Sequence, residues 1–124
     1  MDYTGAIVDY DRAIELEPDY ASAYNNRGTA KESLKKYAGA ITDFDRAIEL
    51  EPDNASAYNN RGNVRHNLQD YTGAIADYSQ AIDLRPDAII YYNRANSKEN
   101  LGDTAGAAAD RERATRITTE NEAK

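Results

Sequence analysis

The chain has 124 residues, 22 of them acidic and 15 basic, and its net charge of −7 argues against binding to a nucleic-acid backbone, which requires clustered lysines and arginines. It contains no cysteine, which excludes disulfides and thiolate metal sites. No secretory signal opens the chain and no apolar run approaches the roughly 20 residues that span a bilayer, so we expect a cytoplasmic protein without membrane contact.

The sequence repeats with a period of 34 residues, as the spacing of Pro18, Pro52 and Pro86 shows. Within each unit, apolar residues recur at intervals of three and four, which is the pattern of amphipathic helices. Proline ends the units, and Asp53 and Asp87 are the expected N-caps of the helices that follow. We therefore expect an all-α chain of seven helices over residues 2–16, 21–34, 37–50, 55–68, 71–84, 88–101 and 104–118.

These helices define a single domain over residues 1–118. Residues 2–16 are the unpaired second helix of a partial repeat, and full units of two helices follow at 21–54, 55–87 and 88–118. The last unit is one residue shorter, because a deletion falls after Asp87 in a linker. The polar residues 119–124 are expected to form a disordered tail.

The repeated residues resemble the tetratricopeptide repeat, whose pattern of aromatic, small and proline positions is followed by Tyr24, Gly28, Leu34, Tyr37, Ala40, Phe44, Ala47 and Pro52. The resemblance covers nearly the whole chain. It implies a right-handed α-solenoid in which the first helix of each unit lines a concave face, and it does not assign a partner. One departure is an arginine in a column where the motif often has leucine, at Arg27, Arg61 and Arg94.

Each unit also carries an aspartate on its second helix, at Asp43, Asp77 and Asp110. Because the arginine and the aspartate recur together, we expect a hydrogen-bonded ion pair between packed helices. The less favoured alternative is that the arginines bind a ligand.

Asparagine is concentrated on the first helices, where residues four apart share one face. A primary amide matches the donor and acceptor of a peptide bond. We therefore expect the concave face to bind an extended peptide through Asn25, Asn26, Thr29, Asn59, Asn60, Asn63, Asn67, Tyr92, Asn93, Asn96 and Asn100. Glu32 and Glu99, near the rim, would favour neutral or basic peptides. The alternative is that these amides are solvent-exposed side chains without a ligand, inherited when one ancestral unit was duplicated.

No catalytic motif accompanies the amides. His66 is the only histidine, without a second histidine or a cysteine to form a zinc site, and we expect it to be exposed to solvent. The sequence has no glycine-rich phosphate loop and no nucleophile elbow. We expect a protein-interaction scaffold that is not an enzyme and uses no metal or cofactor.

The two ends of the chain differ. The last helix replaces apolar positions with Arg111 and Thr115, so it can face solvent, whereas the first helix keeps Ile7, Tyr10 and Ile14 without a preceding helix to cover them. We therefore expect that the first helix either belongs to a longer array or is covered by another chain. A homodimer formed through this helix is the basis of the alternative function, a structural self-assembly module.

Overall fold

The computed structural model describes residues 1–123, and within that range every regular element is an α-helix. Except at the C-terminal end of the last helix, the predicted and observed boundaries agree to within one residue. The helices are α1 (Tyr3–Leu16), α2 (Ala21–Ser33), α3 (Tyr37–Leu50), α4 (Ala55–Asn67), α5 (Tyr71–Leu84), α6 (Ala88–Asn100) and α7 (Thr104–Glu122).

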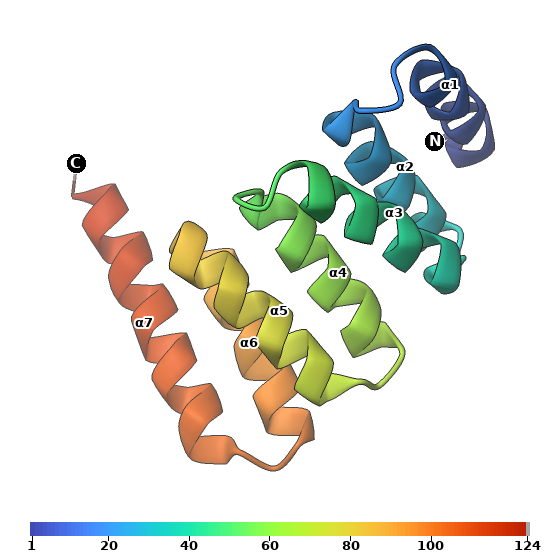
Figure 1. Cartoon of the computed structure of the whole chain (residues 1–124). Helices are drawn as coiled ribbons and strands as arrows, with labels where there is room; N and C mark the ends of the chain where they lie inside the picture. Colours follow the sequence, from blue (N-terminus) through green and yellow to red (C-terminus); the bar gives the residue numbers. More distant parts are fainter. Residues whose placement is uncertain (124) are drawn as a thin grey trace.

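The helices stack in chain order, and the two termini lie at opposite ends of the stack (Figure 1). Each helix packs against the next one, while α2 also contacts α4 and α4 also contacts α6. The first helices of the three full repeats therefore form one continuous face of the solenoid, as the predicted fold class requires.

The core lies between paired helices and is built from small residues, with one buried aromatic ring in each of the first two hairpins. Phe44 is fully buried and Tyr78 is 2% exposed. Each ring lies on a glycine of the facing helix: a Cβ added to Gly28 would lie 2.7 Å from Phe44, and one added to Gly62 would lie 2.8 Å from Tyr78. Glycine is favoured here because the aromatic ring occupies the space that a Cβ would need.

Helix caps agree with the sequence prediction at one site and differ at another. Asp87 caps α6, and its side chain accepts a hydrogen bond from the backbone N–H of Ile89. The helix after Pro52 is capped by Asn54 and not by Asp53, because α4 begins one residue later than that aspartate would require. The Asn54 side chain accepts from the N–H of Ala57.

The turns within the three hairpins contain a residue in the left-handed backbone region. The φ angles are +60° at Lys35, +64° at Gln69 and +86° at Gly102. In each turn, the backbone N–H of the residue after the left-handed position donates a hydrogen bond to a carbonyl in the last turn of the preceding helix. One example is the bond from Asp70 N to Arg65 O at 2.8 Å. This is the usual C-terminal stop of a helix, and glycine is the residue that it favours.

The predicted disordered tail is wrong for residues 119–122, because α7 continues to Glu122. No proline or glycine interrupts the segment, so the helix has no local reason to stop at residue 118. The part of that prediction that concerns Lys124 lies outside the described residues. Over residues 1–123, no helix is both long enough and apolar enough to cross a membrane.

Candidate functional site

The predicted pairing of arginine with aspartate is confirmed in all three full repeats. Each arginine donates two hydrogen bonds, from Nε and Nη2, to the two carboxylate oxygens of the aspartate on the following helix. Their lengths are 2.9 and 2.7 Å for Arg27 and Asp43, 3.0 and 2.8 Å for Arg61 and Asp77, and 2.9 and 2.7 Å for Arg94 and Asp110. This geometry holds the two helices of a repeat together.

A second cation binds each of these buried aspartates from one helical turn further along the first helix. The added pairs are Lys31 with Asp43 at 3.1 Å, Arg65 with Asp77 at 2.8 Å, and Lys98 with Asp110 at 3.0 Å. Burial opposes ionisation of Asp110, but the hydrogen bonds from Arg94 and Lys98 outweigh it and lower its pKa. The sequence pattern predicted one cation for each aspartate. The second cation, which was not predicted, stands four residues after each arginine on the same helix.

The arginines also contact the preceding repeat. The guanidinium Nη1 reaches Asp11, Asp45 or Ser79 of the preceding second helix, at 2.8, 2.8 and 3.0 Å for Arg27, Arg61 and Arg94. Each guanidinium carbon also lies 5.4–5.5 Å from the centre of a tyrosine ring on its own helix. Because their donors are occupied inside the molecule, these arginines do not form a ligand-binding row.

Some of the predicted peptide-binding amides bridge neighbouring first helices. Asn60 Nδ2 donates to Asn25 Oδ1 at 3.2 Å, and Asn93 Nδ2 donates to Asn59 Oδ1 at 3.1 Å. In both bridges the donor directly precedes the arginine of its repeat, and the acceptor lies two residues before the arginine of the preceding repeat. These four amides therefore stabilise the stacking of helices with part of their hydrogen-bonding capacity.

The first and last of the three first helices each have a neighbour on one side only, and this explains the residues that stand at the bridging positions there. Asn26 has no preceding first helix, and it lines a small cleft with Thr29 and with Tyr10 of α1. Tyr92 occupies the position of the first asparagine in the last repeat, where no later first helix needs an acceptor, and it is 41% exposed. Asn100 donates to the backbone oxygen of Asn96 on its own helix at 2.8 Å.

Two further amides accept hydrogen bonds from the second helix of their own repeat. Tyr78 Oη donates to Asn63 Oδ1 at 2.6 Å, and Arg111 Nη2 donates to Asn96 Oδ1 at 3.2 Å. In the first repeat the ring position is Phe44, which has no donor, and the matching position on α2 is Thr29. The amide is thus present in the two repeats where a donor reaches it.

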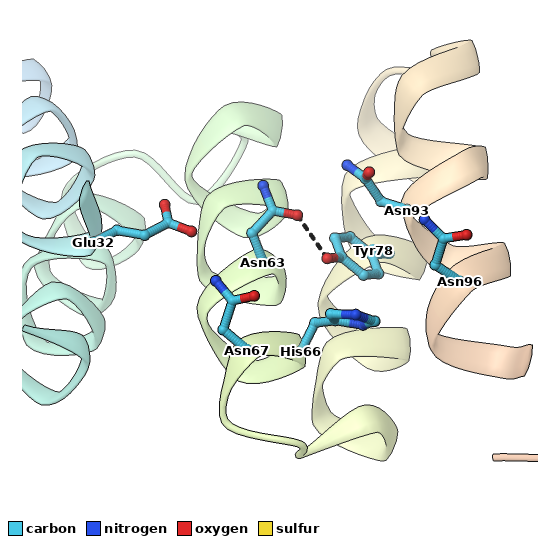
Figure 2. A pocket seen from close by; sticks show the side chains of 7 residues that line it. All are labelled: Glu32, Asn63, His66, Asn67, Tyr78, Asn93 and Asn96. Carbon is cyan, nitrogen blue, oxygen red and sulfur yellow. Dashed lines mark hydrogen bonds between the residues drawn. The ribbon is translucent and has the colours of Figure 1, made fainter. Parts of the chain in front are cut away.

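A cleft of about 230 Å³ lies on the face of α2, α4 and α6 and brings four of the predicted site residues together (Figure 2). Its walls are Glu32, Asn63, His66, Asn67, Tyr78, Asn93 and Asn96. Asn67 has no side-chain hydrogen bond within the described chain, and the Asn63 nitrogen and the Asn93 oxygen are also unoccupied. These groups are available to a ligand.

The prediction that His66 is exposed is wrong. Its Nδ1 lies 2.8 Å from the hydroxyl of Ser97, which is fully buried, and its ring meets that of Tyr71 edge-on at 5.1 Å. The histidine therefore links α4 to α6 at the base of the cleft. Among residues 1–123, no group of three histidine, cysteine, aspartate or glutamate side chains is arranged to hold a metal ion.

The two glutamates expected near the rim differ in their surroundings. Glu99 forms an ion pair with Arg111, which neutralises it. The carboxylate of Glu32 extends from α2 toward α4 and has no hydrogen-bond or ion-pair partner within residues 1–123, and burial raises its pKa (Figure 2). Burial, together with the negative charges of Glu32 and Asp77, also raises the pKa of Tyr78.

The repeated helical hairpins define a class of protein, the helical-repeat scaffolds for protein–protein interaction. More specifically, the chain belongs to the tetratricopeptide repeat family: a model described as "TPR repeat" matches residues 2–35 and 33–69, and one described as "Tetratricopeptide repeat" matches residues 55–87. No curated protein sequence matches the chain.

Among solved structures, the chain is similar to MamA. One crystal structure of MamA has 24% sequence identity and a TM-score of 0.94 over 98% of this chain and 72% of that one. Another has 25% identity and a TM-score of 0.87 over 92% and 63% of the two chains. MamA from Desulfovibrio magneticus RS-1, beginning at its residue 41, has 20% identity and a TM-score of 0.89 over 96% and 68%.

Proposed function

We propose that the face formed by α2, α4 and α6 binds an extended segment of a partner protein and that it does so without catalysis. The observation that carries the proposal is the cleft in which Asn67 and parts of Asn63 and Asn93 retain unused donors and acceptors. Groups of this kind pair with peptide N–H and C=O groups. Because backbone contacts depend little on side chains, such a face accepts many sequences.

Asn67→Ala is the cleanest test, because this amide supports no other part of the described structure. We expect it to weaken binding two- to tenfold, the range for the loss of one or two neutral hydrogen bonds. Asn63→Ala is a poor test, since it also leaves the buried hydroxyl of Tyr78 without its acceptor.

Binding is measured on an array of random nine-residue peptides with the full chain. The matched control is Asn121→Ala, which removes the same amide from α7, away from the cleft. Equal binding by Asn67→Ala, Asn121→Ala and the unchanged chain would contradict the proposed site.

A second candidate function, self-assembly through the N-terminal helix, is favoured by the exposure of α1. No residue of α1 is buried, and Val8 and Leu16 are 61% and 73% exposed. The predicted interface residues Ile7, Tyr10 and Ile14 are partly buried. Val8→Asp places a charge at an exposed apolar residue of α1 and leaves those three residues unchanged.

Sedimentation velocity over a range of concentrations tests this second function. If α1 mediates assembly, the unchanged chain forms oligomers that Val8→Asp abolishes while peptide binding is unaffected. A monomer at every concentration, with or without the substitution, would exclude it.

A further inference from the structure

We infer that the cleft beside Glu32 receives a basic side chain of the bound segment, with the Glu32 carboxylate as its ion-pair partner. The inference rests on the proposed function, because it specifies which residue of an extended partner is anchored at this point. Its physical basis is the contrast between Glu32 and the other enclosed acidic groups of the molecule.

The buried aspartates are all paired. Asp43, Asp77 and Asp110 are between 2% and 4% exposed, and each contacts one arginine and a second lysine or arginine. Glu32 is half-buried and has neither. A partly desolvated carboxylate without a partner destabilises the free protein, and an incoming cation removes that cost.

No lysine or arginine of the described chain lines the cleft. Of the basic groups near the cleft, Arg111 is paired with Glu99 and His66 is hydrogen-bonded to Ser97. Lys31, which directly precedes Glu32 on α2, is bound to Asp43 of α3. The cleft therefore has an acidic group and no free cation.

The remaining walls suit an ammonium or guanidinium group. The amide oxygens of Asn67 and Asn93 are free acceptors that a bound cation needs once it leaves water. At about 230 Å³ the cleft is smaller than the roughly 300–1,000 Å³ that small-molecule sites occupy, so it is sized for one side chain.

Other side chains fit the cleft less well. An acidic side chain would face Glu32 without a compensating cation, and an apolar one would complete the desolvation of Glu32 without pairing it. The net charge of −7 also draws basic segments toward the protein from a distance, and this attraction weakens as salt is added.

The test uses acetylated nine-residue peptides of alternating serine and alanine with lysine, norleucine or glutamate at the centre. Side-chain amide resonances of Asn63 and Asn67 are followed by NMR as each peptide is titrated into the full chain. We expect the lysine peptide to bind about tenfold more tightly than the norleucine peptide, the effect of one charge-assisted hydrogen bond, and the glutamate peptide to bind most weakly.

Glu32→Gln should abolish the preference for lysine over norleucine, because it removes the carboxylate that pairs with the cation. Glu99→Gln is the matched control, because Glu99 is already neutralised by Arg111, and it should retain the preference. Equal binding of the lysine and norleucine peptides by the unchanged chain, or a lysine preference that survives Glu32→Gln, would overturn the inference. If none of the peptides perturbs the amide resonances, the proposed function itself fails.

Discussion

Each repeat is held together by a cluster of charged side chains that has the same geometry three times. In the second full repeat, Asp77 accepts from both Arg61 and Arg65 and is almost fully buried. Arg61 in turn shares its charge with Asp45 of the preceding repeat. The aspartate is thus the centre of the cluster, and the two cations partly replace one another.

Because the aspartate has two cations and each cation is partly replaceable, removing the aspartate should lower the free energy of unfolding more than removing one arginine. Asp77→Ala leaves two enclosed cations without their carboxylate and should lower the free energy of unfolding by about 3–5 kcal/mol. Arg61→Leu leaves Asp77 paired with Arg65 and packs an apolar side chain against Tyr58, so its cost should be less than half as large. Urea unfolding of the two variants measures the difference, and equal losses would contradict the assignment of Asp77 as the centre.

A single backbone angle supplies another prediction at the same scale. Gln69 has a φ of +64° in the turn between α4 and α5, whereas the corresponding position of the last repeat is Gly102. Glycine adopts this angle without steric cost, so Gln69→Gly should raise the free energy of unfolding by about 0.5–1 kcal/mol. Thermal unfolding of Gln69→Gly is compared with that of Gln69→Ala, which keeps a Cβ at the positive φ angle and therefore keeps the steric strain. A gain from the alanine variant as large as that from glycine would be inconsistent with a backbone origin.

Side-chain partners were predictable where a residue type recurs with the repeat. The pairing of arginine with aspartate follows from two columns of opposite charge, and the structure confirms it. The bridges of Asn60 to Asn25 and of Asn93 to Asn59 were not predicted, because asparagine suits both a solvent-exposed face and a contact between helices. Only the distance between adjacent first helices decides between these roles.

At the scale of whole helices, the prediction was based on the repeat period and on the residues that end helices. Recurrent prolines and spacings of three and four residues placed seven helices with nearly correct bounds. The error at the end of α7 arose from treating a polar composition as disorder, although polar residues extend an exposed helix readily. The cap of α4 was misplaced by one residue, which is the usual uncertainty of helix ends.

The helix α1 differs from its equivalents because only one side of it is covered. Phe44 and Tyr78 are buried under the glycine of a preceding first helix, but Tyr10, at the same position in the repeat, is only partly buried. Asp9 occupies the place of the buried Asp43 and is exposed. Local stability follows the number of buried apolar contacts, so α1 should open most readily.

Hydrogen–deuterium exchange of the 124-residue chain tests this difference between helices. Amides of α1 should exchange faster than those of α3 and α5, which have the same length and nearly the same sequence pattern. The measurement uses dilute samples, because oligomer formation through α1 would also protect its amides from exchange. Protection of α1 equal to that of α5 in a dilute monomer would show that a covering helix is not needed.

For the molecule as a whole, the repeat determines the architecture and only partly determines the site. Stacking of similar hairpins follows from a 34-residue repeat that contains two amphipathic helices, and the chain shares this fold with MamA at low sequence identity. The cleft depends on differences between repeats, since Glu32, Asn67 and Asn93 come from three separate first helices. A sequence shows these differences but not that they meet at one place.

The location of a bound peptide is the measurement that tests the account most directly. Intermolecular NOEs between the backbone protons of the lysine-centred peptide and the side-chain amides of the full chain report which face is occupied. We predict cross-peaks to Asn63, Asn67 and Asn93 and none to residues on the outer sides of α3 and α5. Cross-peaks confined to those outer helices, with none to the three asparagines, would contradict the proposed mode of recognition.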